Sequence, residues 1–190
     1  MELNGNALVS WEFVRDYGDF KDAQMDKVIN LINWISSKAE TIAQRELVTK
    51  ERTLDVCGNG TPRIYLPVIP VTEVASVTID STHIFAIDPV DPTEYHVNPK
   101  GGIITRYNYR WPTGTYNIRV VYTAGWTIAD MPAEIRKACL EAITTAWSRQ
   151  NDQSYGVQSK TMPNGVNVSY EPRLSPDVYG TFAELRLGLV

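Results

Sequence analysis

Hydrophobic residues recur at helical spacing between residues 22 and 47. The apolar positions follow one another in alternating steps of three and four residues: Met25, Val28, Ile32, Ile35, Ala39 and Ile42. This spacing places them on one face of a helix, and three further apolar residues widen that face: Ile29, Leu31 and Trp34. Neither Gly nor Pro interrupts the segment. We therefore predict one helix over 22–47, about 39 Å long, whose apolar face needs a partner surface.

Two further segments flank this helix in the predicted scaffold. Ser10 can cap a short helix over 11–16, and Pro132 can occupy the first position of a helix over 132–149. The second of these has an apolar face with many small residues: Ile135, Ala138, Cys139, Ala142, Ile143, Ala146 and Trp147. We expect it to pack against the long helix as an antiparallel-like pair. The polar residues 1–6 are expected to be loose.

Between residues 52 and 125 the helical period disappears, and short runs of β-branched and aromatic residues replace it. We predict strands at 63–66, 74–79, 83–86, 94–97, 102–106 and 115–123. Turn signals rich in Gly, Pro, Asn and Asp separate these runs. Pro67 and Pro70 exclude 66–71 from a central strand, so an extended edge segment is expected there. The pattern indicates a small antiparallel meander, sandwich or partial barrel.

The remaining chain, 150–190, is predicted to form a polar loop and a final helix. Asn164-Gly165 is a possible hairpin turn between arms at 157–162 and 166–170. Ser175, Pro176 and Asp177 signal the start of a helix. Its apolar face consists of Val178, Phe182 and Leu185, and Gly188 ends it.

These elements predict an α+β fold. A helical scaffold, 8–50 and 132–149, carries a β-rich insertion at 52–125, and the segment 150–190 follows. We expect a single domain over residues 1–190.

Composition and charge exclude several classes of protein. The net charge of −4 is mild, and no part of the chain is a basic block, so bulk electrostatic binding of nucleic acid is not expected. The N-terminal sequence lacks the pattern of a secretory signal, and no apolar run approaches the ~18 residues of a membrane span. Cys57 and Cys139 belong to no metal-binding or redox motif, and Cys139 is expected to be a buried free thiol.

No catalytic or cofactor motif is present in the sequence. His83 and His96 lie in separate predicted strands, and we interpret both as structural or surface residues. Three acidic residues could collect a cation but lack a calcium-loop spacing, which favours a solvated loop: Asp88, Asp91 and Glu94. Four aromatic residues could form a stacking platform, although core packing is the commoner role: Tyr107, Tyr109, Trp111 and Trp126. From the residues alone we expect a non-enzymatic interaction protein without metal or cofactor.

The order of motifs resembles the head–tail connector (adaptor) proteins of tailed bacteriophages. The resemblance covers roughly residues 8–187 and rests on these stretches: 10–15, 22–47, 60–77, 95–104, 111–114, 118–126 and 131–140. The loop 150–170 matches by position only. This resemblance implies a ring, commonly of twelve subunits, beneath the portal at the capsid vertex. Such a ring extends the channel for double-stranded DNA, which passes without sequence-specific binding, and it presents a surface to the next neck, stopper or tail protein.

The resemblance also implies roles for the last forty residues or so. The C-terminal segment is expected to dock on the portal through Tyr170, Pro172, Leu174, Val178, Tyr179, Phe182, Leu185 and Leu187. Four residues of the polar loop are expected to face the channel or a neighbouring subunit: Gln158, Lys160, Asn164 and Asn167. Packing alone favours the final helix folding back on its own domain about as strongly. The chain would be made in the host cytoplasm and reside in the virion, without membrane contact.

Two functions from other classes remain open at the level of sequence. One is a carbohydrate- or surface-binding module that uses Trp111 and Trp126. The other is a hydrolase with dispersed residues, which a buried, perturbed carboxylate or histidine in a deep pocket would favour.

Overall fold

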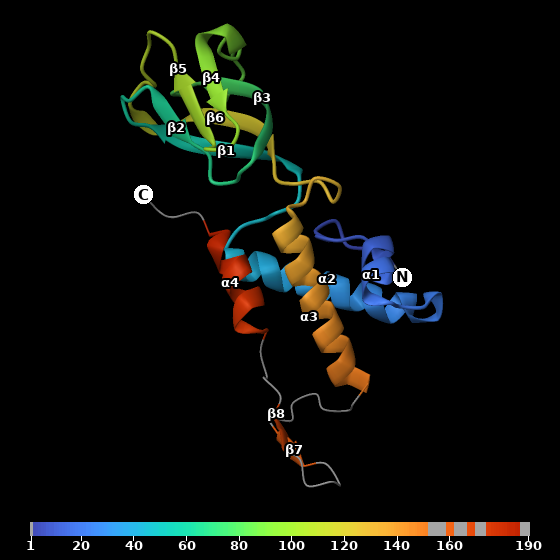
Figure 1. Ribbon diagram of the computed structural model, residues 1–190. Helices are drawn as coiled ribbons and strands as arrows, with labels where there is room; N and C mark the ends of the chain where they lie inside the picture. Colours follow the sequence, from blue (N-terminus) through green and yellow to red (C-terminus); the bar gives the residue numbers. More distant parts are fainter. Residues whose placement is uncertain (1, 152–158, 162–166, 170–173, 187–190) are drawn as a thin grey trace. The chain divides into compact units, whose positions relative to one another are not determined.

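The computed structural model describes residues 2–151, 159–161, 167–169 and 174–186. The chain divides into two compact units, residues 1–46 with 128–190 and residues 47–127 (Figure 1). The first unit is mainly helical, and the second consists mainly of strands. The predicted α+β class is confirmed, while the division into a scaffold and an insertion at 52–125 stays a prediction. The single domain over 1–190 stays a prediction.

The helical unit contains α1 (Trp11–Gly18), η1 (Asp22–Gln24), α2 (Met25–Ala43), α3 (Ala133–Asn151) and α4 (Pro176–Glu184), with the short strands β7 (Ser159–Thr161) and β8 (Asn167–Ser169). The β unit contains β1 (Lys50–Gly58), β2 (Arg63–Tyr65), β3 (Val71–Ile79), η2 (Pro92–Glu94), β4 (Tyr95–Asn98), β5 (Ile103–Arg106) and β6 (Gly114–Ala124).

The long helix is shorter at both ends than the sequence predicts. The 3₁₀ turn η1 precedes it, and Gln44 ends it in a left-handed conformation, donating its N–H to the carbonyl oxygen of Glu40. The predicted end at residue 47 was wrong because Leu47 accepts a hydrogen bond from the N–H of Trp126 and so belongs to the β unit. The sequence contains no Gly or Pro that signals this change.

The apolar stripe of α2 forms the centre of the helical core. Its members are at most 5% exposed: Val28, Ile32, Ile35, Ala39 and Ile42. Met25, the first residue of α2, is 40% exposed, and Trp34 is 47% exposed. Trp34 lies about 120° around the helix from the centre of the stripe. The prediction that Met25 and Trp34 belong to the buried face was therefore wrong.

The N-terminal segment lies along α2, so the prediction that residues 1–6 are loose was wrong. Five hydrogen bonds hold it there, among them those from Asn4 N to Asn33 Oδ1 (2.9 Å), from Asn6 Nδ2 to Glu40 Oε2 (3.0 Å) and from Leu8 N to Ser36 Oγ (3.1 Å). These three acceptors on α2 recur at steps of three and four residues, so they share one helix face. Leu8 and its neighbours Ala7 and Val9 are buried, which ties this segment to the core.

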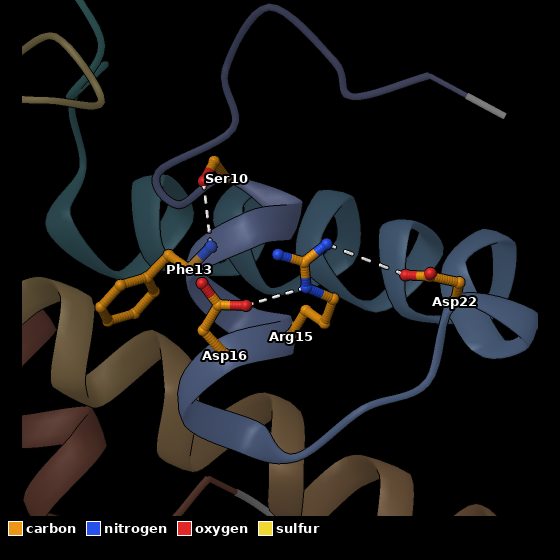
Figure 2. A network of polar contacts seen from close by, with 5 residues as sticks. All are labelled: Ser10, Phe13, Arg15, Asp16 and Asp22. Atoms are coloured by element: carbon orange, nitrogen blue, oxygen red, sulfur yellow. Dashed lines mark hydrogen bonds and ion pairs between the residues drawn. The ribbon is translucent and has the colours of Figure 1, made fainter.

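Helix α1 begins as the sequence predicts and is linked to the start of the long helix. The Ser10 hydroxyl oxygen accepts a hydrogen bond from Phe13 N at 3.2 Å, which satisfies one free donor of the first turn. Figure 2 shows Arg15 between two carboxylates, with Nε 2.8 Å from Asp16 and Nη1 3.9 Å from Asp22. These interactions connect α1 to the residue at which η1 begins.

Helix α3 crosses α2 and does not lie antiparallel beside it (Figure 1). Its predicted apolar positions are buried: Ile135, Ala138, Cys139, Ala142, Ile143 and Ala146. The half-buried Trp147 meets the ring of Phe20 edge-on, with centroids 5.4 Å apart. The prediction of an antiparallel pair of α2 and α3 was wrong, because α3 packs against α1 and α4 as well as α2. Its apolar face is divided among three helices.

The β unit consists of two three-stranded antiparallel sheets that share one core. The strand orders are β1-β6-β3 and β2-β5-β4. The sequence alternation over 116–123 predicts buried side chains at Tyr116, Ile118, Val120 and Tyr122, and the last three are buried. Tyr116 is instead 57% exposed, with a positive φ of 47°, and its neighbour Asn117 is buried. The core also takes side chains from the second sheet, among them Ile64, Tyr95 and Ile104.

Three predictions for the β unit need correction. Residues 83–86 form no strand, and His83 and Phe85 adopt positive φ angles of 64° and 54°. Strand β1, at Lys50–Gly58, was missed because its polar and charged residues hide the alternation. The extended edge segment expected at 66–71 is not formed, because residues 67–70 are bends and the edge strand β3 begins only at Val71.

Candidate interaction surfaces

The C-terminal helix packs on its own unit. The Ser175 hydroxyl oxygen accepts a hydrogen bond from Val178 N, and Pro176 opens the helix, as predicted. Val178 is 2% exposed and Phe182 is fully buried. The helix α4 that carries them packs against α2 and α3. The predicted end at Gly188 was wrong, because α4 ends at Glu184. Val178 and Phe182 thus hold the helix in place.

The remaining residues of the predicted portal-docking set are distributed differently. Tyr179 is 47% exposed on α4, while Leu174 and Leu185 are half-buried. Tyr170, Pro172 and Leu187 lie outside the described residues. Within the described part of the set, Tyr179 is therefore the residue best placed to contact another protein.

The predicted hairpin in the polar loop is present in its paired strands. β7 and β8 are antiparallel, with Lys160 opposite Val168 and Thr161 opposite Asn167. Two of the four predicted channel or inter-subunit residues, Lys160 and Asn167, lie in these strands. Gln158 and Asn164, with the predicted Asn164-Gly165 turn, lie outside the described residues.

The proposed aromatic platform is not assembled. Trp111 is fully buried, and its indole Nε1 donates a hydrogen bond to the Pro62 carbonyl oxygen at 3.0 Å. Arg106 stacks nearby, 5.4 Å from the Trp111 ring and 4.9 Å from that of Tyr109. Trp111 therefore supports the β core and is not available for stacking on a sugar.

Two of the three acidic residues of the 88–94 segment, Asp91 and Glu94, have structural roles, while Asp88 is exposed. Asp91 caps η2 by accepting hydrogen bonds from Thr93 N and Oγ1, which lower its pKa. Glu94 pairs with Arg106 at 2.7 Å. Among the described residues, no group of three His, Cys, Asp or Glu side chains could hold a metal ion, and no helix there is long and apolar enough to cross a membrane.

The loop after β3 is a surface feature that the sequence reading missed. The buried Asp80 carboxylate accepts hydrogen bonds from Thr82 N (2.7 Å), Thr82 Oγ1 (2.7 Å) and Phe85 N (2.8 Å). These contacts hold the left-handed turns at His83 and Phe85, a conformation unfavourable for residues with a side chain. The loop therefore has a fixed shape, of which the sequence shows only that Asp80 and Ser81 are residue types common in turns.

The same loop is fastened to the outer face of β6. Arg119 makes two hydrogen bonds to Asp55 on β1, at 2.7 and 2.8 Å. The Phe85 ring lies over the guanidinium, with the Arg119 Cζ atom 4.1 Å from the ring centroid. The hydrogen bond from Arg119 lowers the pKa of Asp55. Loop and sheet are thus joined into one surface, on which Ile84 and Ile87 remain 73% and 54% exposed.

A comparison with protein families places this architecture. A family model described as "Head completion protein" matches residues 7–178, which includes α1–α3, the whole β unit and the start of α4. A comparison with curated proteins found no match.

Chains in solved structures of gene transfer agent (GTA) particles have a similar fold. A chain in the neck of an empty GTA particle, computed with C6 symmetry, has a TM-score of 0.59 at 18% identity. A chain in the virion of a native gene transfer agent (GTA) particle has a TM-score of 0.62 at 16% identity. In both cases the match covers 100% of this chain and 94% of the other. These findings confirm the expected relationship, and the chain belongs to the head completion protein family.

Proposed function

We propose that this chain is a structural head–tail connector, or adaptor, that forms a ring beneath the portal and joins the head to the neck and tail. The observation that carries this proposal is the family match over residues 7–178. The fold likeness across the whole chain to chains of GTA neck and virion structures supports it. The ring extends the DNA channel, and the chain itself does no chemistry.

The number of copies in the ring is proposed to be twelve. One of the similar neck structures was computed with C12 symmetry. A cyclic ring requires two different, complementary faces on each subunit. The chain offers separate candidate surfaces in its helical and β units, so one subunit can meet its ring neighbours and the adjacent head or tail proteins.

The portal is proposed as the partner of the C-terminal segment. Val178 and Phe182 fix α4 on the helical unit, which leaves Tyr179 and the residues beyond α4 to make the contact. Lys160 and Asn167, with Gln158 and Asn164, are proposed to face the channel or the neighbouring subunit. The mild net charge of −4 suits a channel through which double-stranded DNA slides, because few cations grip the phosphates.

The localisation follows from the same proposal. The chain is made in the cytoplasm of the bacterial host and is incorporated into the virion at the head–tail interface. The downstream contact is a neck, stopper or tail protein.

A reconstruction of the particle tests this function. Particles that carry the chain should show twelve copies directly below the portal, with the α2–α3 crossing and the two-sheet unit recognisable in each. When the gene for this chain is deleted, assembly should yield DNA-filled heads that lack tails. The proposal fails if the chain lies elsewhere in the particle, or if tails attach normally without it.

A further inference from the structure

The two sheets of the β unit have outer faces that differ in chemistry. Because both sheets contribute to one core, their outer faces point away from each other. The outer face of β1-β6-β3 carries the loop after β3, with Phe85 over Arg119. The outer face of β2-β5-β4 lies on the opposite side of the unit.

The first surface, which we call the isoleucine loop, consists of residues 80–91. Ile84 and Ile87 are large apolar side chains that the rest of the fold leaves 73% and 54% exposed. The hydrogen bonds to Asp80 and the stacking of Phe85 fix the backbone that presents them. Asp88 and Asp91 are exposed beside them. The loop is thus an apolar knob with an acidic rim, ordered before any partner binds.

The second surface, which we call the tyrosine face, is the outer side of β2-β5-β4. The strand register places two rows of side chains on it: Tyr65, Ile103 and Asn98, and Arg63, Thr105 and His96. Tyr65 is 62% exposed, and Ile103 beside it is half-buried. Lys100 is exposed in the turn that joins β4 to β5. All six positions in the two rows are described, and none is acidic.

We infer that the isoleucine loop of one copy seats on the tyrosine face of the next copy in the ring, which rests on the ring proposed above. The two surfaces match in chemistry, because an apolar knob with an acidic rim meets an apolar and aromatic surface with a basic rim. They also match in placement. In a ring of twelve, successive copies differ by a rotation of about 30°, so the two contact faces of a subunit lie nearly opposite each other.

The contact explains three features that have no evident role in the isolated chain. Ile84 and Ile87 would be buried between copies. The left-handed backbone at His83 and Phe85 would serve to present them, since such strain persists where the surroundings hold it and often marks a functional surface. Tyr65 would become an aromatic anchor at the centre of an interface, a role in which tyrosine is common.

Cross-linking in assembled particles tests this contact. In a Cys57→Ser background, which removes the exposed thiol, Ile84→Cys is combined with Tyr65→Cys, and a short bismaleimide is added. The expected result is a ladder of covalent multimers up to the full ring. The matched control combines Ile84→Cys with Thr53→Cys, an exposed residue of β1. Thr53 is predicted to lie on the same outer face as the loop, so it should give no ladder.

A second measurement tests the contact even if the cysteine variants fail to assemble. In a reconstruction of the wild-type particle, Ile84 should lie against Tyr65 of the next copy. The variant Ile84→Asp with Ile87→Asp should lower the yield of tailed particles by on the order of tenfold or more, while its isolated chain keeps the wild-type melting temperature.

The outcomes separate the two proposals. A neck ring of this chain without the ladder, or with other residues between copies, overturns the contact and leaves the connector function standing. Absence of the chain from the neck overturns both.

Discussion

The Nε atom of Arg186 donates a hydrogen bond to the carbonyl oxygen of Ile42 at 2.7 Å, joining the residues after α4 to the last turn of α2. The four last carbonyls of a helix lack partners within the helix, so Arg186 satisfies one of them from a segment far away in sequence. Together with the buried Phe182, this bond makes α4 part of the helical core. It changes how the proposed docking of the C-terminal segment should be tested.

Substitution within α4 should separate folding from attachment. Phe182→Ala removes a fully buried ring and should lower the free energy of unfolding by about 3–5 kcal/mol. Tyr179→Ala, three residues earlier and half-exposed, should change it by less than about 0.5 kcal/mol but reduce attachment to portal-bearing heads. Thermal melting and a head-binding assay measure the two effects. Normal attachment by the Tyr179 variant would remove this residue from the proposed portal contact.

Deletion of the whole C-terminal segment is a poorer test than the sequence suggests. From the sequence alone, removal of residues 172–190 is expected to leave a folded chain that cannot attach. Because Val178 and Phe182 are core residues, their loss should expose the apolar surfaces of α2 and α3 on which α4 packs and destabilise the chain. An attachment defect in that variant would not distinguish misfolding from a lost contact.

Neighbouring residues on α2 offer a test of the helical core. Ile35 is fully buried, while Trp34 beside it is 47% exposed. Ile35→Ala should lower the free energy of unfolding by about 2–5 kcal/mol, and Ile35→Asp should cost more because it buries an unpaired charge. Trp34→Ala should cost less than about 0.5 kcal/mol, although it removes the larger side chain. Chemical denaturation of the three variants measures this, and equal effects at both positions would contradict the assigned face of α2.

The two cysteines should differ in reactivity. Cys57 is exposed and Cys139 is buried in α3, where loss of hydration raises the pKa of its thiol to about 12. Because the thiolate is the reactive form, an aromatic disulfide reagent at neutral pH should titrate one thiol in the native chain and two in denaturant. Cys57→Ser should abolish the native reaction. Rapid modification of Cys139 in the folded protein would show that α3 is not packed as described.

Periodicity predicted those elements whose apolar side chains all face one core. The stripe on α2, the small-residue face of α3 and the alternation along β6 each follow from side chains that meet one core. The cap at Ser175 was also predictable, because its hydrogen bond to Val178 N lies within four residues of sequence. These features need no knowledge of distant parts of the chain.

Elements fixed by distant partners were not predictable in the same way. Asn4 and Asn6 look like part of a free polar terminus until Asn33 and Glu40 supply their hydrogen-bond acceptors. β1 has a charged sequence, and its place as a strand depends on pairing with β6 more than 50 residues away. The His83–Ala86 run has strand-like composition, yet the Asp80 carboxylate turns it into a loop. The candidate surface at Ile84 was hidden for this reason.

The loop and its sheet should respond to pH through two carboxylates. The pKa of Asp80 is lowered by its hydrogen bonds from Thr82 and Phe85 N, and that of Asp55 by its hydrogen bond from Arg119. A carboxylate whose pKa is lower in the folded than in the unfolded state stabilises the fold above its unfolded pKa, near about pH 4. That stabilisation is lost as the pH falls through the folded pKa. The melting temperature of the β unit should therefore be constant from neutral pH to about pH 5 and fall below it.

Substitution of Asp55 distinguishes this origin from general acid denaturation. Asp55→Asn removes the charged partner of Arg119, so it should lower the melting temperature at pH 7 and reduce the decline on acidification. Asp88→Asn, which changes an exposed carboxylate of the isoleucine loop, should leave both nearly unchanged. Melting curves at a series of pH values, with NMR titration of the Asp55 carboxyl carbon, provide the measurement. An Asp55 carboxyl that titrates at or above its ordinary pKa would show that the Arg119 pair does not stabilise the β unit, and that this pair does not help to hold Arg119 under the Phe85 ring of the isoleucine loop.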